Sequence, residues 1–347
     1  MAGTSEIFSN RVITTVNIKY IPKVIDTILN SNVFAQRVIR AAKSWKTDGG
    51  RKLRVPIKVS KNTTFVSFRG FDTFSTAPTD NRQYMEFDPA FVQITSALPM
   101  DELAIADTDG KVLNLIALTL QSDVEDMADS IGDLMYADGT GNNSKDPLGL
   151  AALVDDGTSI TTIGGLNRNT YTTLKSTVTG SGGTLTLAKM DTMWNAVTSG
   201  QQKPTIIVTT EAVFSLYEQL LRPQERIYKE VSMVKGLKMG TGATGLSYKG
   251  IEIVADEKCP SGYMYFLNEN YLDWYALPMP KDLAQPVNYK TQIEGNDYKA
   301  PLGLGFSWSD WIKPSNAAGI VGHIYFGGQL VCTNPKRQGV LTGITGI

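Results

Sequence analysis

Apolar residues between positions 111 and 136 recur every three or four residues, which is the period of one helix face. Polar residues fill much of the opposite face, and oxygen-bearing side chains at 107–109 could cap the start. The pattern predicts an amphipathic helix of about 39 Å at ~1.5 Å per residue. Its apolar positions are Leu113, Ile116, Leu120, Val124, Met127, Ile131 and Leu134, and its polar positions are Gln121, Asp123, Glu125, Asp126, Asp129 and Asp133.

A second pattern, of period two, covers residues 53–60 and predicts a β-strand, with Pro56 favouring an edge position. We expect a second strand over 63–71, a polar tip at 78–81 and a return at 84–87. Together these segments predict a long two-stranded ribbon. Because an isolated hairpin is barely stable in water, such a ribbon is expected to lie on a neighbour.

The rest of the chain alternates helical and extended patterns, which favours an α/β module with a mixed sheet. Residues 1–45 form an arm with scattered apolar positions, and a helix is expected from Pro22 to Ile39. A Thr-, Gly- and Ser-rich segment at 158–185 predicts exposed loops, and Gly327 with Gly328 predicts a turn. Helices are expected at 187–200 and 210–221, and strands at 91–94, 205–208, 250–255, 264–267, 272–277, 306–311 and 320–326.

Composition narrows the classes of function. The 347 residues include 33 basic and 34 acidic side chains, for a net charge of -1, so no basic excess indicates tight nucleic-acid binding. No apolar run has the length of a membrane span, and the first residues do not resemble a secretory signal. Cys259 and Cys332 are too few for a disulfide framework and are expected to be buried thiols in a reducing cytoplasm.

Candidate chemistry is sparse. His323 is the single histidine and lies in a strand pattern, so we interpret it as structural. Residues 236–245 contain Gly240, Gly242 and Gly245 in a Gly-x-Gly-x-x-Gly spacing, but a strand rather than a helix follows. A subunit-contact loop is favoured there over a phosphate site. Oxygen-bearing residues at 138–146 indicate a turn, with a weak calcium site as the alternative. The sequence predicts no catalytic, metal or cofactor-binding residue.

Several segments, in their order, resemble HK97-fold major capsid proteins of tailed bacteriophages. The long helix resembles the spine helix of that family, and the ribbon resembles its extended loop (E-loop). The remaining matches are the Gly-rich turn before Pro147-Leu-Gly-Leu150, the stretch Ile163-Gly-Gly-Leu-Asn-Arg168, the strand Tyr248-Lys-Gly-Ile-Glu-Ile-Val254 and the closing stretch Gly328–Gly339.

This resemblance implies an α+β, HK97-like capsid fold and a division of the chain into parts. The expected parts are an N-terminal arm (1–45), the E-loop (46–88), a peripheral domain with the spine helix (89–146), an axial α/β domain (147–300) and a C-terminal return to the peripheral domain (301–347).

The function that the resemblance implies is structural rather than enzymatic. The chain is expected to self-assemble, through pentamers and hexamers, into an icosahedral virion shell in the host cytoplasm. The shell would enclose double-stranded DNA without sequence-specific binding, with scaffolding, portal and decoration proteins as further partners. Two alternatives stay open: an encapsulin-type nanocompartment shell, and an α/β enzyme using the loop at 236–245.

Locally basic residues of the ribbon suggest how subunits meet. We hypothesise that they pair with an acidic surface of a neighbouring subunit, such as the outer face of the spine helix. The candidate contact residues are Arg54, Lys58, Arg69 and Arg82 on the ribbon, Asp126 and Asp129 on the helix, and Gly240 and Gly242 in the glycine-rich loop.

Overall fold

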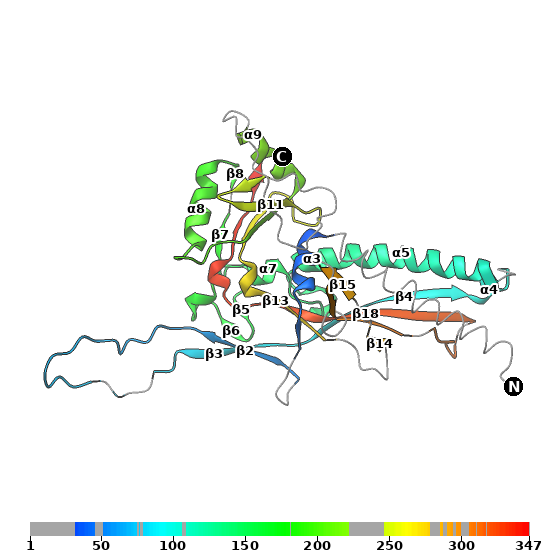
Figure 1. Ribbon diagram of the computed structural model, residues 1–347, viewed down its shortest axis with the longest axis horizontal. Helices are drawn as coiled ribbons and strands as arrows, with labels where there is room; N and C mark the ends of the chain where they lie inside the picture. The colour runs from blue at the N-terminus through cyan, green and yellow to red at the C-terminus, as the bar shows by residue number, and fades with distance from the viewer. Residues whose placement is uncertain are drawn as a thin grey trace.

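The computed structural model describes most of the chain: residues 32–45, 51–74, 76, 79–105, 109–180, 182–221, 246–277, 285–286, 290–293, 296–299, 305–309, 311–316 and 318–346. The described part is elongated (Figure 1). A long helix and two long strands run together toward one end, a two-stranded ribbon projects toward the other, and a compact α/β module rises between them. The α+β architecture expected from the sequence is therefore present.

The first sheet is built on the longest strand, β18 (Gly319–Cys332). One edge of β18 pairs with β4 (Ala90–Pro99) over ten positions, from Gly319 opposite Pro99 to Gly328 opposite Ala90. The further members of this sheet are β1 (Lys43–Ser44), β13 (Leu272–Ala276), β17 (Phe306–Trp308) and β14 (Gln285–Pro286).

Helix α5 (Asp109–Tyr136) is the expected spine helix and packs against β4. Its 28 residues span about 42 Å at ~1.5 Å per residue. The apolar stripe is buried as the periodicity predicts, with Ile116, Leu120, Val124, Met127 and Ile131 all in the core. The short α4 (Met100–Ile105) precedes α5 at the far end of the sheet.

The second sheet has the strand order β10, β11, β9, β12, β19 and β7, with both parallel and antiparallel pairs. Two helices, α8 (Leu187–Val197) and α9 (Glu211–Leu221), pack on one face through Ile207, Ile253 and Phe266. The opposite face, with Val208, Tyr265 and Leu267, joins the core beneath α5. The strands are β7 (Thr177–Thr179), β9 (Ile206–Thr209), β10 (Ser247–Tyr248), β11 (Ile251–Ala255), β12 (Met264–Leu267) and β19 (Gly339–Leu341).

Helix α3 (Val33–Arg40) fastens the described end of the arm to the body. Asp256 Oδ2 accepts a hydrogen bond from the Phe34 backbone N–H at 3.2 Å, so a distant carboxylate serves the first turn of this helix. Arg37 pairs with Glu252 at 3.0 Å and with Glu269 at 2.8 Å. The part of the expected arm before residue 32 lies outside the described residues.

The remaining elements are short. They are α6 (Gly141–Ser144), α7 (Leu150–Leu153), β5 (Thr162–Ile163), β6 (Leu166–Asn167), η2 (Thr172–Leu174), β8 (Gly183–Thr184), η4 (Glu269–Tyr271), β15 (Lys290–Ile293), β16 (Asn296–Lys299), η6 (Pro335–Arg337) and β20 (Ile344–Thr345).

Two local expectations were wrong, and a third was wrong in part. The segment 63–71 forms no strand, because the ladder of the ribbon ends where Lys58 faces Arg82. Gly327 and Gly328 lie inside β18, where a Cβ at Gly327 would stand 2.3 Å from the Leu277 carbonyl oxygen, so glycine allows close strand approach rather than a turn. The segment 158–185 is dominated by loops, as expected, but it also contains short strands and buries Arg168 and Leu174, so it is not exposed throughout.

Each of the two sheets contains strands from distant parts of the sequence. β13, at Leu272–Ala276, belongs to the first sheet, and β19, at Gly339–Leu341, belongs to the second. Neither sheet is therefore confined to one of the expected ranges 147–300 and 301–347.

Candidate subunit-contact surfaces

The ribbon has a root that is folded on its own chain. β2 (Leu53–Lys58) pairs antiparallel with β3 (Arg82–Phe87) in a two-stranded sheet. One face of the pair is buried and consists of Leu53, Val55, Ile57, Met85 and Phe87. The strict alternation of buried and exposed residues in β2 is the pattern from which the strand was predicted. The root is thus a fixed base from which the rest of the ribbon projects.

The outer face of the root is charged and exposed. Arg54 Nε donates to Glu86 Oε1 at 2.9 Å, so this candidate contact residue already has a partner within its own chain. At the end of the ladder Lys58 lies directly opposite Arg82. Like charges in directly opposed positions destabilise an antiparallel pair, and an approaching anion would relieve this repulsion. Lys58 and Arg82 are thus two cations in opposed positions at the end of the root.

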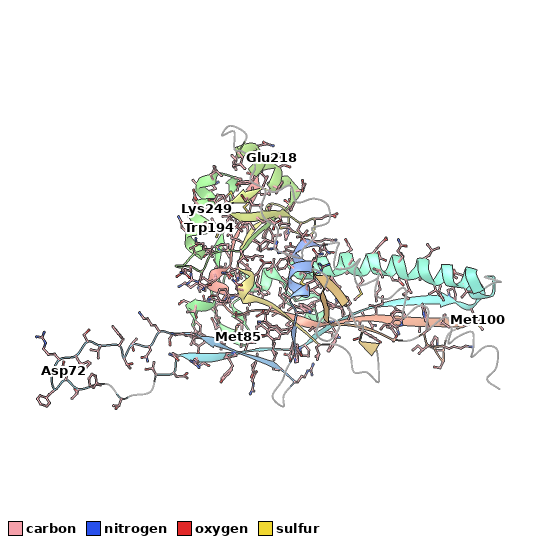
Figure 2. The ribbon with its side chains drawn as sticks, in the orientation of Figure 1. Asp72, Met85, Met100, Trp194, Glu218 and Lys249 are labelled. Atoms are coloured by element: carbon pink, nitrogen blue, oxygen red, sulfur yellow. The ribbon has the colours of Figure 1, made fainter. Side chains whose placement is uncertain are left out.

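Beyond Val59 the ribbon continues as a strandless loop that exposes aromatic side chains. Phe65 is 92% exposed and Phe71 is 106% exposed, while Phe68 and Phe74 touch only edge to face, with ring centroids 5.0 Å apart. Fully burying one such side chain is worth about 1.5–3 kcal/mol, so this surface is costly to leave in water. Figure 2 shows the loop at the far end of the molecule, with Asp72 near its tip and Met85 at its root.

The sequence analysis did not predict that these phenylalanines form an exposed apolar surface. The signal was present, because Phe65, Phe68, Phe71 and Phe74 recur at every third position, a spacing that fits neither a strand nor a buried helix face. Arg69 lies among them, and its backbone N–H donates to Asp72 Oδ2 at 2.8 Å. The loop therefore combines apolar and cationic groups.

The outer face of α5 is acidic, as predicted. Asp126 and Asp129 are both exposed on it. Lys258, which follows β11, forms ion pairs with Asp129 and with Asp133. The hydrogen bond to Asp129 raises the pKa of Lys258 above its ordinary value, and burial opposes that rise. One of the two predicted acidic contacts is thus partly neutralised within the chain.

No ion pair among the described residues joins the ribbon cations to these acids. Figure 1 shows why: the ribbon and α5 extend from the body in opposite directions. If the predicted pairing between ribbon and spine helix occurs, it requires two copies of the chain.

A groove of about 910 Å³ opens at the base of the ribbon. Its walls come from the root, from the turn after α5 and from the β5–β6 turn, and they carry both cations and anions. The charged lining residues are Arg51, Lys52, Glu86, Asp88, Asp138, Lys145 and Asp146. Within the part of the chain that is described, no group of His, Cys, Asp and Glu side chains could hold a metal ion. Residues 138–146 contain the short α6, and Asn142 Nδ2 donates to Asp146 Oδ1 at 2.7 Å.

The remaining candidate residues have structural surroundings. His323 Nδ1 lies 2.9 Å from Thr95 Oγ1 across the β4–β18 pair. Cys259 and Cys332 are free and buried, and burial raises the pKa of Cys332 to about 12. Gly240 and Gly242, with the whole loop at 236–245, lie outside the described residues. None of the described helices has both the length and the apolar character needed to cross a membrane.

Comparison with known proteins gives a match in three dimensions and none in sequence. No protein-family model matches the chain. No curated protein matches it either.

Solved structures, by contrast, match over almost the whole chain. The capsid subunit of cyanophage A-1(L) superposes with a TM-score of 0.60 at 18% identity, covering 89% of this chain and 91% of that one. An encapsulin from Synechococcus elongatus PCC 7942 gives 0.53 at 13% identity, covering 87% and 85%. The capsid of Myoviridae phage XM1 gives 0.51 at 13% identity, covering 88% and 90%. The chain therefore has the HK97-like fold of phage capsid subunits, which the encapsulin shares.

Proposed function

We propose that this chain is a major capsid protein that assembles with copies of itself into the icosahedral head shell of a tailed phage. The single observation that carries the proposal is the ribbon. One face of its root is buried, while its loop, at the end of the molecule marked by Asp72 in Figure 2, exposes Phe65 and Phe71 to water. A fold shared with capsid subunits supplies the partner, because a second copy in a shell can cover what the first copy exposes.

The charges of the ribbon support the same arrangement. Lys58 and Arg82 face each other at the end of the root, and α5 offers exposed Asp126 on a different side of the molecule. A head-to-tail contact between copies would bring unlike charges together. Heterologous contacts form rings when the rotation between copies closes, and we propose pentamers and hexamers of this kind as the building units of the shell.

The enclosed material is proposed to be double-stranded DNA. The net charge of -1 supports a wall that surrounds DNA without sequence-specific binding. Assembly in the host cytoplasm, the residence of the chain in the virion, and scaffolding, portal and decoration proteins as partners belong to this proposal. So does the division into arm, E-loop, peripheral and axial domains.

A nanocompartment shell is the second candidate because the encapsulin has the same fold. The cyanophage subunit is the more similar of the two by TM-score, 0.60 against 0.53, which supports the phage assignment. An enzymatic role for the loop at 236–245 is a separate alternative, and nucleotide binding by the purified chain would be its direct test.

The test is negative-stain electron microscopy together with sedimentation of the protein expressed alone and purified from its native source. Closed icosahedral particles, or free pentamers and hexamers, are expected. A chain that stays monomeric or dimeric under all assembly conditions would overturn the shell assignment. The contents of native particles then separate the two shells, since DNA indicates a phage head and an enzyme cargo indicates a nanocompartment.

A further inference from the structure

A small hairpin from the middle of the chain seats directly against the root of the ribbon. Strands β5 and β6 meet at a turn formed by Gly164 and Gly165, both with positive φ. The Gly164 carbonyl oxygen accepts a hydrogen bond from the Glu86 backbone N–H at 3.0 Å. Glu86 lies in β3, next to Met85, whose side chain is fully buried. The turn therefore accepts a backbone hydrogen bond from a strand that lies ~80 residues earlier in the sequence.

The approach at Gly164 is close enough to exclude any side chain. A Cβ placed there would lie 2.6 Å from Met85 Cβ and 3.1 Å from Met85 Cα. Gly165 has a similar left-handed conformation, yet a Cβ there would meet no atom within 4 Å. Both positions favour glycine because of their positive φ, so alanine would carry similar backbone strain at each. Only at Gly164 would the added side chain also collide with the ribbon.

Arg168 fixes the hairpin to the body from the other end. Its side chain is fully buried, with Nη1 donating to the Ile160 carbonyl at 3.0 Å and Nη2 donating to the Ala152 carbonyl at 2.6 Å. Nη1 also lies 3.2 Å from Asp155 Oδ1. These contacts tie the hairpin to α7 and to the buried carboxylate of Asp155. Truncating Arg168 would leave that carboxylate without its charge partner, which is costly in a buried position.

A third contact occurs where the ribbon leaves the body. Thr173 Oγ1, beyond the hairpin in η2, donates to the Val59 carbonyl at 3.5 Å. Val59 directly follows β2, and its N–H donates to the Asn81 carbonyl at 3.0 Å. The segment that carries the hairpin therefore contacts β3 at Glu86 and the chain just beyond β2. The ladder ends where this support ends, and the exposed loop begins there.

We propose that the β5–β6 hairpin, anchored by Arg168, is the positioning element that sets the direction in which the ribbon leaves the subunit. The consequence for assembly rests on the proposed function, because a ribbon that leaves the subunit in another direction would not reach the neighbouring copy. The contact at Gly164 is the point where the direction is fixed. Small displacements there are carried along the length of the ribbon to the phenylalanines at its end.

The matched pair Gly164→Ala and Gly165→Ala tests the proposal. Spin labels on Lys58→Cys in the ribbon and Ser122→Cys on α5 report the ribbon-to-body distance by pulsed electron paramagnetic resonance. The buried native thiols leave these two sites as the accessible ones. Measurements use dilute free subunits, so the result does not depend on shell formation. Gly164→Ala is expected to shift or broaden the distance distribution, and Gly165→Ala is expected to preserve it.

A second variant tests the anchor. Arg168→Lys keeps the charge but loses the forked contacts, so the distribution is expected to broaden while circular dichroism still shows the folded body. If this variant does not fold, the glycine pair decides alone. An unchanged distribution in Gly164→Ala, or an equal change in Gly165→Ala, would overturn the inference.

The yield of assembled particles is a second measurement, and it would not differ between the two variants if Gly164 only helped the subunit to fold. Gly164→Ala is expected to lower the yield of closed particles about tenfold relative to Gly165→Ala, which corresponds to ~1.4 kcal/mol. Equal yields from the two variants would contradict the positioning role. A wild-type chain that forms no particles would instead overturn the proposed function, and the distance measurement would still decide the role of the hairpin.

Discussion

The root and the loop of the ribbon are neighbours in sequence and opposites in structure. In the root, β2 and β3 pair along six positions and bury Leu53, Val55 and Met85. In the loop, backbone ladder and apolar cover are both absent among the described residues, and Phe65 and Phe71 stand in water. The difference shows that contacts within the chain bury the apolar side chains of the root but not those of the loop. Folding of the single chain buries one face of the root but leaves the phenylalanines of the loop exposed, and the proposed shell would cover them with another copy.

The largest expected effect comes from removing the apolar surface of the loop. Phe65→Ser combined with Phe71→Ser should abolish particle formation, because burial of two phenylalanines supplies about 3–6 kcal/mol per contact. The free subunit should keep its thermal unfolding temperature, since both side chains are already exposed. Sedimentation velocity and differential scanning calorimetry measure the two outcomes.

The control for this pair is Phe65→Leu with Phe71→Leu, which retains most of the apolar area. Particles should still form, in smaller yield. Normal assembly of the double serine variant would show that the loop does not mediate contact between copies.

The next largest effect lies in the root. Met85→Ala should lower the free energy of unfolding by about 2–5 kcal/mol, the usual cost of truncating a fully buried large side chain. The neighbouring Tyr84→Ala, at an exposed position of the same strand, should change it by about 0.5 kcal/mol or less. Denaturant titration of both variants gives the comparison. Similar values for the two would mean that the root is not held by its buried face.

A smaller effect is expected at the junction between root and loop. Arg82→Glu replaces a like-charged pair with Lys58 by an unlike one, which should stabilise the free subunit by about 0.2–1 kcal/mol. The same change should weaken assembly if the cations of the ribbon meet an acidic neighbour. Chemical denaturation and light-scattering assembly assays at low and high salt separate these effects. Unchanged assembly at low salt would count against the pairing of ribbon and spine helix.

The smallest effect concerns the body, where α5 packs on β4. Asp123 accepts a hydrogen bond from the buried Ser96, and burial raises the pKa of Asp123 above its ordinary value of 3.8 despite that bond. The folded state therefore favours the protonated acid. This contribution to stability is present below about pH 3.8 and is lost as the pH rises through the folded pKa.

Asp123→Asn isolates this contribution because it keeps a neutral group at every pH. The free energy of unfolding of the natural chain, relative to the variant, should fall as the pH rises above 3.8. Urea titrations between about pH 3 and 6 measure the difference. Parallel curves would mean that burial does not raise the pKa of Asp123. Acids with a lowered pKa, such as Asp138, contribute equally to both proteins and cancel in the comparison.

The sequence predicted well wherever a periodic pattern faces a core of the same chain. The spine helix followed from the spacing of Ile116, Leu120 and Val124, and β2 followed from the alternation around Pro56. These patterns report burial directly, because each apolar position must meet an apolar partner. The α/β module was predicted for the same reason.

Prediction failed where contacts are long-range or specific to one atom. Gly327 was expected to make a turn, but it lies within β18. Glycine occupies this position because the Leu277 carbonyl approaches it closely, and no local sequence pattern encodes such a contact. Arg168 was noted only as part of a short motif, although it is among the most deeply buried side chains. The phenylalanines of the loop were missed because no core of their own chain covers them.

The most direct test of the account is a cryo-electron microscopy reconstruction of assembled particles at side-chain resolution. We predict that Phe65 and Phe71 of each copy are buried against a different copy, with the root in the conformation described above. Particles in which both side chains remain in solvent, or fold back onto their own chain, would contradict the claim that the loop is completed by a neighbour.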